Sequence, residues 1–341
     1  MSRSTVVIVF VVFVVAIVAV WLWPTYKKEP LPIVLQTESI VCVDEAPQNF
    51  SLREEEELSF LPIRKEAIHE VIHSTSLDCD LPKEVDLIDQ LFTPHASNLS
   101  IIETVSYVSR VPWLIERPAY LGDWAAHYET SKHFISRSIM GAAHYFNEKV
   151  SRGDHFNVFR KDKTIEFHMV VDLSRTKLWL YYFDKDENKR ELLKSYPVCV
   201  GMLTEGKRSG SLTPTGVFEV GREVAIYKEG DRGLYMNEVC EMITVFGQRW
   251  IPLSREIADC SGPCKGLGLH GVPWTRDPET GALVEKRECI GGYTSLGCIR
   301  LLTEDIQEIF SIIVSKRSYV HIVKDFQDAH LPGELCGLYN P

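Results

Sequence analysis

The hydrophobic pattern divides the chain into an apolar N-terminal run, a helical middle and a β-rich C-terminal half. Residues 6–23 form an uncharged apolar run. As a helix, this run is about 27 Å long, close to the thickness of a bilayer's hydrocarbon core. Trp21 and Trp23 stand at its end, where indole rings favour the headgroup region, and Pro24 stops the helix. We therefore predict a transmembrane anchor over residues 5–23. A cleaved signal peptide is the alternative, but no small-residue cleavage site follows the run.

The two segments after the apolar run differ in helical periodicity. Residues 24–52 contain four prolines and no helical period, which indicates a linker. The pattern becomes helical near residue 53, with the acidic run Glu54–Glu57 at a helix start. Amphipathic stretches rich in aromatic residues continue from there. We predict an α-rich region over residues 53–155, whose role no motif indicates.

From about residue 156 the pattern changes to short runs of β-branched and aromatic residues between turn formers. The runs predicted as strands are Phe156–Phe159, Thr164–Asp172, Thr176–Phe183, Tyr196–Val200, Gly216–Val220, Glu241–Val245 and Ser318–Val323. One helix fits Thr303–Ser315, with Thr303 as its N-cap and acidic residues in its first turn. The predicted fold class is mostly β, with a domain over residues 160–326 and a C-terminal tail over residues 327–341.

Composition and charge exclude several classes of protein. Apolar residues make up 45% and charged residues 25% of the 341 residues, which is typical of a globular chain. The formal net charge is −10 and no dense block of Lys and Arg occurs, so we expect no nucleic-acid partner. The nine cysteines contain no pair of closely spaced Cys-x-x-Cys motifs, which argues against a zinc ribbon.

Two short segments of the β-rich half carry the residue types of thiol-dependent acyl transfer. His270 lies in Leu267–Gly271, and Cys298 follows Gly297 in Thr294–Leu301. A thiol attacks an acyl group as the thiolate, and a nearby imidazole can take its proton. A glycine before the cysteine lets backbone amides turn toward a developing oxyanion. By itself, such a pair does not distinguish a catalytic site from a buried structural cysteine.

Further motifs accompany this pair in a fixed order. They are Val171–Ser174, Tyr196–Gly201 and Thr213–Phe218 before it, and Gly297–Leu301, an acidic helix and a closing strand at its end. With these motifs, about residues 165–325 resemble the L,D-transpeptidase catalytic domain, the YkuD family of cell-wall enzymes. The resemblance implies a YkuD-like β-sandwich or barrel with one helix after the cysteine motif.

The resemblance assigns catalytic roles to matching positions. Cys298 corresponds to the family's nucleophile and His270 to its general base. The carbonyl of Gly271 would steady that base, and the amides of Gly297 and Cys298 would form the oxyanion hole. The resemblance implies no metal, nucleotide or other cofactor.

Three further positions correspond to residues near the family's substrate, namely Arg300, Ser295 and the aromatic Trp274. The chain also departs from the family pattern twice. Leu296 replaces the histidine of the usual Ser-His-Gly-Cys, which affects contacts at that spot, and the segment between His270 and Ser295 is longer than usual. Asp277–Gly281 is predicted to form a turn in this insertion, which would reshape the lid over the cleft.

The implied reaction is acyl transfer on peptidoglycan. Cys298 would attack a stem tetrapeptide, release D-Ala and pass the acyl group to an amine of another stem, giving a 3–3 cross-link. Water as acceptor would make the protein an L,D-carboxypeptidase, and a protein lysine would make it an anchoring enzyme. A non-catalytic wall-binding module is a further alternative, motivated by Leu296.

This chemistry sets the expected location and partners. We predict a single-pass protein of the bacterial inner membrane, with its catalytic domain on the outer side. Its expected partners are peptidoglycan stem peptides, the membrane through residues 6–23, and wall-associated proteins through the N-terminal region.

A second motif suggests different chemistry. His69, Glu70 and His73 form a literal His-Glu-x-x-His, in which two histidines one helical turn apart can bind zinc with the glutamate as base. Polar residues flank the motif and no persuasive third ligand is visible. We therefore favour a polar helix face and keep a zinc protease as the alternative.

The eight cysteines other than Cys298 leave their pairing open, because eight cysteines allow 105 arrangements. Cys260 and Cys264 are close enough in sequence to clip a loop in an oxidising compartment.

Overall fold

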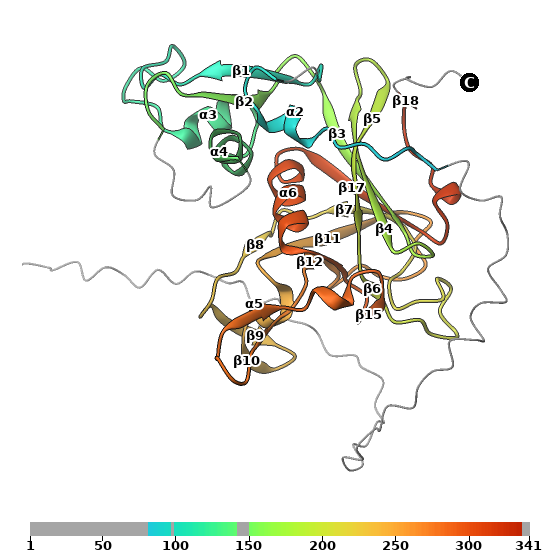
Figure 1. Ribbon diagram of the computed structural model, residues 1–341. Helices are drawn as coiled ribbons and strands as arrows, with labels where there is room; N and C mark the ends of the chain where they lie inside the picture. The colour runs from blue at the N-terminus through green and yellow to red at the C-terminus, as the bar shows by residue number, and fades with distance from the viewer. Residues whose placement is uncertain (1–80, 97–98, 142–149, 336–341) are drawn as a thin grey trace, which may run out of the picture. The chain divides into compact units, whose positions relative to one another are not determined.

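The structure is a computed structural model that describes residues 81–96, 99–141 and 150–335. Its main element is a ten-stranded sheet in the order β16-β12-β11-β7-β17-β3-β4-β5-β18, with β8 paired to β11 (Figure 1). The strands are β3 (Ile165–Asp172), β4 (Lys177–Asp184), β5 (Lys189–Pro197), β7 (Gly216–Val220), β8 (Ala225–Ile226), β11 (Arg249–Ala258), β12 (Gly268–Gly271), β16 (Ile299–Leu301), β17 (Arg317–Val323) and β18 (Glu334–Leu335). The prediction of a mostly β catalytic half is confirmed.

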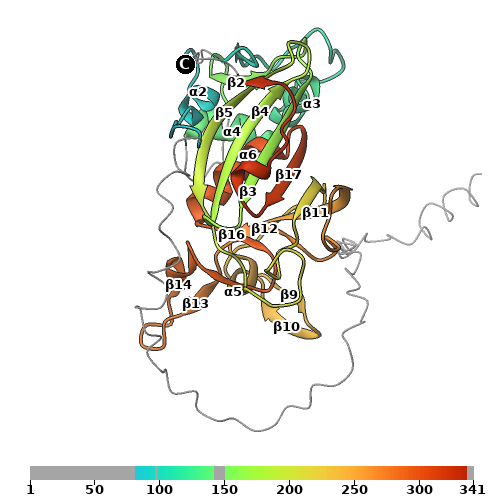
Figure 2. The same cartoon turned by 90° about the vertical axis from the view of Figure 1, so that its right-hand side faces the viewer.

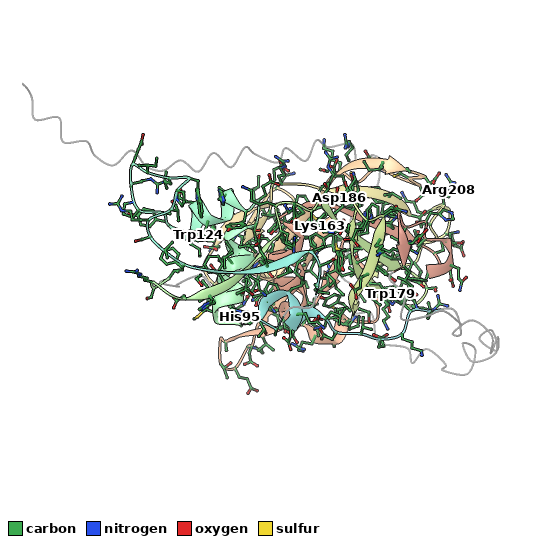
Figure 3. All side chains as sticks on the ribbon, turned by 90° about the horizontal axis from the view of Figure 1, so that it is seen from above. His95, Trp124, Lys163, Trp179, Asp186 and Arg208 are labelled. Carbon is green, nitrogen blue, oxygen red and sulfur yellow. The ribbon has the colours of Figure 1, made fainter. Side chains whose placement is uncertain are left out.

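Local hydrogen bonds stabilise both ends of the β3–β4 pair in the middle of this sheet. β3 and β4 pair antiparallel, and the fully buried Asp172 closes their turn by accepting from the amides of Ser174 and Arg175. At the opposite end of the pair, where Lys163 and Asp186 lie close together (Figure 3), Asp186 accepts from the amide of Thr164. Both strands are buried along nearly their whole length, which explains their almost continuous apolar sequence.

One long helix packs against the sheet. α6 (Thr303–Ile313) places Ile306, Ile309 and Phe310 in the main core, and Figure 2 shows it beside β3 and β17. Its first-turn acidic residues are as predicted, but its N-cap is Leu302, whose side chain makes no capping bond. Glu285 instead accepts from the Thr303 amide at 2.7 Å and satisfies the helix start.

Short elements surround the end of the sheet that holds the predicted catalytic residues. They are β6 (Val200–Gly201) paired with β15 (Tyr293–Ser295), β9 (Arg232–Tyr235) paired with β10 (Glu238–Glu241), β13 (Trp274–Arg276) paired with β14 (Leu283–Glu285), α5 (Ile243–Phe246), η2 (Arg287–Cys289) and η3 (Phe326–Asp328). The strand predicted over Glu241–Val245 is wrong over most of its length. There α5 turns the chain so that the Phe246 ring packs on Trp250 and His270, and this packing overrides the β-branched sequence.

The described part of the N-terminal region mixes helices with a two-stranded ladder. Its elements are α2 (Ile88–Phe92), β1 (Ile102–Ser106), α3 (Leu121–His127), α4 (Lys132–Met140) and β2 (His155–Phe159), with β1 and β2 antiparallel. Leu91, Phe134 and Phe159 belong to the same core as the sheet and α6. This region and the sheet therefore share one hydrophobic core.

A buried polar cluster reinforces that shared core. The side chain of Glu308 on α6 accepts from Arg137 of α4 at 3.2 Å and from the Tyr196 hydroxyl at 2.8 Å. Lys194 completes the cluster at 3.0 Å from the same carboxylate. Glu308 thus ties α4 and β5 to α6.

The predicted membrane location requires correction. Across the described ranges no helix is long and apolar enough to cross a bilayer. The longest described helix, α6, has 11 residues and is about 16 Å long, roughly half of a hydrocarbon core. The single-pass inner-membrane location and the membrane contact through residues 6–23 are therefore not supported. Residues 6–23, the linker over 24–52 and the His69–His73 motif lie outside the described residues.

Candidate active site

Strand pairing brings the two predicted catalytic residues to neighbouring strands. β12 and β16 run parallel, with His270 opposite Arg300 and Leu269 opposite Ile299. Cys298 immediately precedes β16, two residues before Arg300. The paired residues His270 and Arg300 lie on one face of these strands, and Cys298 is two residues before Arg300. The fold thus joins two segments that lie far apart in sequence.

His270 is held as a neutral base. Its side chain is buried, and Nδ1 lies 2.7 Å from the carbonyl oxygen of Gly271. A carbonyl can only accept, so Nδ1 carries the proton and Nε2 keeps its lone pair. Burial, and then the charge of Arg300, lower the pKa of His270 to about 3, while the carbonyls of Gly271 and Phe246 oppose this shift. The imidazole is therefore neutral at ordinary pH.

Cys298 is a half-buried thiol. Its Sγ lies 3.9 Å from the carbonyl of Gly266, which is its hydrogen-bond partner in this structure in place of the imidazole. Burial raises the pKa of the Cys298 thiol, and the amide of Gly268 and the charge of Arg300 act in the opposite direction. The thiol is therefore protonated at neutral pH and needs a base to react.

The loop before Cys298 is organised by Ser295. Ser295 is fully buried, and its hydroxyl donates to the Cys298 carbonyl at 2.6 Å and accepts from the Gly297 amide at 3.1 Å. Gly297 has φ +122°, and a Cβ there would lie 3.0 Å from the carbonyl oxygen of Leu212. Only glycine fits this turn without strain. Ser295 therefore holds the backbone of this loop, whereas the side chain of the neighbouring Leu296 is 55% exposed.

Arg300 places an uncompensated positive charge at the site. Its Nε is buried without a hydrogen-bond partner, and its Nη1 makes only a long contact of 3.4 Å to the carbonyl of Thr294. None of the described carboxylates forms an ion pair with it. This charge acts on both Cys298 and His270.

The insertion between the two catalytic segments forms its own hairpin. Trp274 lies on β13 opposite Glu285 of β14, half-buried, with its indole nitrogen unpartnered. The predicted turn over Asp277–Gly281 is confirmed, because the Asp277 carboxylate accepts from the amides of Glu279 and Thr280. None of the described contacts joins Trp274 to Cys298 or His270.

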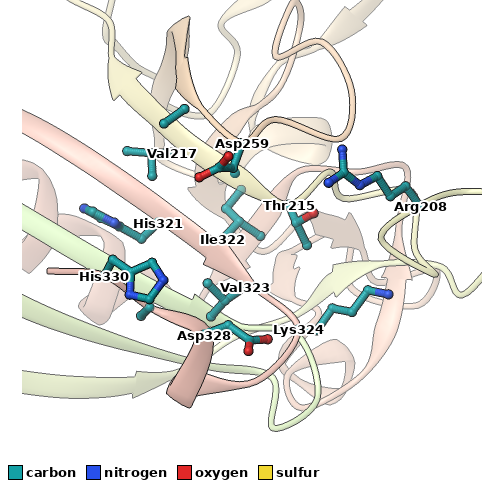
Figure 4. A pocket seen from close by; sticks show the side chains of 13 residues that line it. Arg208, Thr215, Val217, Asp259, His321, Ile322, Val323, Lys324, Asp328 and His330 are labelled. Atoms are coloured by element: carbon teal, nitrogen blue, oxygen red, sulfur yellow. The ribbon is translucent and has the colours of Figure 1, made fainter.

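The two cysteines considered for a loop clip are not joined in the structure. Cys260 and Cys264 are free thiols in the structure. A cavity of about 420 Å³ is lined by Arg208, Thr215, His321, Lys324, Asp328 and His330 among others, and it includes neither Cys298 nor His270 (Figure 4).

Comparison with known proteins identifies the domain that holds these residues. Residues 166–322 match the family model of YkuD, the L,D-transpeptidase catalytic domain, so this part of the chain is a YkuD domain. Among curated proteins, YkuD of Bacillus licheniformis, provisionally assigned as an L,D-transpeptidase, is 27% identical over 192 residues, covering 55% of this chain and 85% of that protein.

Solved structures give a more distant likeness. The helical cell shape determining protein Pgp2 of Campylobacter jejuni matches with a TM-score of 0.31 and 15% identity, over 50% of this chain and 51% of that chain. A variant of the same protein matches with a TM-score of 0.30 and 15% identity, over 51% and 50%. This chain thus spans about half the length of those structures.

Proposed function

We propose that this protein is a peptidoglycan L,D-transpeptidase with Cys298 as nucleophile and His270 as general base. The observation that supports this proposal is the pairing of β12 with β16, which brings the strand of the Gly271-anchored imidazole next to the segment that holds the thiol. The match to the YkuD family model supports this class of enzyme.

The reaction proceeds in two acyl transfers. Nε2 of His270 takes the thiol proton as Cys298 Sγ attacks the carbonyl that joins the third stem residue to D-Ala. The tetrahedral intermediate collapses as the imidazolium returns this proton to the leaving amine, and D-Ala departs. The amine of a second stem then attacks the thioester, His270 accepts its proton, and the thiol is regenerated with that proton.

Arg300 is suited to bind the donor substrate. Its guanidinium is unpaired among the described residues and lies within electrostatic reach of both reacting side chains. Guanidinium groups bind carboxylates with paired hydrogen bonds. Arg300 would therefore hold a stem-peptide carboxylate beside Cys298, and Trp274 would contribute from the hairpin over the cleft.

The test uses purified protein with disaccharide tetrapeptides and mass spectrometry of the products. A cross-linked dimer with loss of one D-Ala supports transpeptidation, whereas tripeptide formed with water identifies a carboxypeptidase. Transfer to an added lysine-containing peptide alone identifies an anchoring enzyme. Cys298→Ala should abolish every product, and Cys240→Ala, which removes a half-buried thiol elsewhere, should not. Binding to peptidoglycan without any product from the wild type would make the protein a wall-binding module.

A further inference from the structure

Thr213 connects the nucleophile loop to a neighbouring strand. Its side chain is fully buried, and its Oγ1 donates to the carbonyl of Gly297 at 2.8 Å. The same oxygen accepts from the amide of Gly201 on β6 at 2.7 Å. One hydroxyl therefore uses both its donor and an acceptor site to fix the carbonyl immediately before Cys298.

That hydrogen bond also determines where the next amide points. The Gly297–Cys298 peptide is trans, as are all peptide bonds of the described residues. In a trans peptide the carbonyl and the following N–H point in opposite directions within one plane. With the Gly297 carbonyl directed at Thr213, the Cys298 N–H is directed away from it. This amide has no acceptor among the described residues.

The other amide of the loop is already used. The Gly297 N–H donates to the Ser295 hydroxyl, which in turn donates to the Cys298 carbonyl. Of the two amides expected to form the oxyanion hole, only that of Cys298 remains free. An oxyanion donor is effective when it is fixed in position before the charge develops.

We infer that Thr213 is a positioning residue that orients the Gly297–Cys298 peptide so that the Cys298 amide donates to the oxyanion of the tetrahedral intermediate. This inference rests on the proposed function, because it concerns the same acyl transfer. Thr213 does not touch the substrate and acts through the peptide plane it holds.

Substitutions at Thr213 distinguish the effect of its hydroxyl group from the effect of its side-chain volume. Thr213→Val keeps the shape and removes both hydrogen bonds, whereas Thr213→Ser keeps the hydroxyl. Thr215→Val is the matched control, because Thr215 is two residues further along the same segment and its hydroxyl makes no hydrogen bond to any of the described residues. If the Val variant does not fold, the comparison of Thr213→Ala with Thr213→Ser replaces it.

Two reactions of the same sulfur provide the readout. Acylation by a carbapenem passes through an oxyanion, whereas alkylation by iodoacetamide does not. Intact-mass spectrometry follows both rates for Cys298, with Cys298→Ala as the background. We expect Thr213→Val to slow acylation about tenfold or more and alkylation less than twofold, with kcat and not KM reduced in turnover. Thr213→Ser and Thr215→Val should acylate like the wild type.

The results that would overturn the positioning role of Thr213 differ from the result that would overturn the proposed function. Equal acylation of Thr213→Val and the wild type, or an equal loss of acylation and alkylation, would overturn the positioning role. A wild-type protein that is alkylated at Cys298 but neither acylated nor active on tetrapeptides would instead overturn the proposed function.

Discussion

The imidazole of His270 is oriented by the carbonyl of the next residue, Gly271, through a hydrogen bond of 2.7 Å from Nδ1. This bond needs no second side chain, so the base is fixed by the backbone of β12 itself. The rings of Phe246 and Trp250 pack around the imidazole at centroid distances of 5.3 and 5.9 Å and limit its rotation. The free Nε2 is the atom that the proposed reaction requires.

Replacing His270 should therefore remove the base and leave the nucleophile in place. His270→Asn is expected to slow carbapenem acylation of Cys298 by about 10²–10⁴-fold, the usual contribution of a general base. Alkylation at alkaline pH, where hydroxide in place of His270 removes the thiol proton, should remain within a fewfold of the wild type. The exposed His330→Asn serves as control. Full acylation by His270→Asn would exclude this histidine as the base.

A second prediction concerns stability at acidic pH. His168 and His321 are buried and joined by a hydrogen bond of 2.9 Å between Nδ1 and Nε2. Burial lowers the pKa of His168 to about 4, with the charges of Arg190 and Lys185 adding to the shift. Burial, and then His168, lower the pKa of His321 to about 3. In the unfolded chain both rings take up protons below about pH 6.5.

The unfolded state therefore binds more protons than the folded state between about pH 6.5 and 4. The stability that these rings contribute is present above pH 6.5 and is lost as the pH falls through this window, by up to about 1.4 kcal/mol per pH unit for each ring. Denaturant unfolding at pH 7, 6 and 5 measures the slope. His321→Asn should reduce it and His330→Gln should not; a slope unchanged by His321→Asn would contradict this account.

Gly297 offers a test of the strained turn before the nucleophile. Gly297→Ala forces a Cβ into a φ of +122° and to 3.0 Å from both Leu212 and Leu267. We expect a loss of about 1–3 kcal/mol in the free energy of unfolding, together with loss of acylation. Gly122→Ala is the contrasting control, because Gly122 lies in helix α3 with open space around it. That change should stabilise the protein by about 0.5–1 kcal/mol. Tolerance of alanine at Gly297 would refute the claimed strain.

Glu308 tests the link between the N-terminal elements and the sheet. Its side chain is 11% exposed and that of its partner Arg137 is 6% exposed, so Glu308→Ala removes one partner of a buried ion pair. We expect a larger loss of unfolding free energy than at an exposed ion pair, because both side chains are buried. Glu304 on the same helix pairs with Arg287 at the surface and is 56% exposed, so Glu304→Ala should cost about 1 kcal/mol or less. Similar losses for the two variants would show that the cluster does not join the two parts.

Local sequence patterns predicted the parts of this structure that local forces determine. Thr164–Asp172 and Thr176–Phe183 were expected as strands because turn formers separate two apolar runs, and Asp172 closes that turn by hydrogen bonds within three residues. The strand predicted over Glu241–Val245 is wrong over most of its length, because contacts of Phe246 with Trp250 and His270 favour the helical turn α5. No local pattern could have shown this.

The candidate site likewise combines residues that motifs predict with contacts that motifs do not reveal. Cys298, His270 and Gly271 could be named from motifs, because their spacing resembles that of a known family. The bond between Thr213 and Gly297 joins residues 84 positions apart, so the two motifs that contain these residues do not reveal their contact. Likewise, the family resemblance implied that the Gly297 amide forms part of the oxyanion hole, but in the structure this amide donates to the Ser295 hydroxyl.

The position of β17 constrains how the protein can be made. This strand, residues 317–323, is synthesised after both of the strands that it joins, and it lies between β3 and β7 near the middle of the sheet. In a chain emerging from the ribosome, β3 and β7 therefore lack the strand that joins them until β17 has been translated. The apolar edges of β3 and β7 are exposed during that interval, which makes the nascent chain prone to aggregation and a natural client for chaperones.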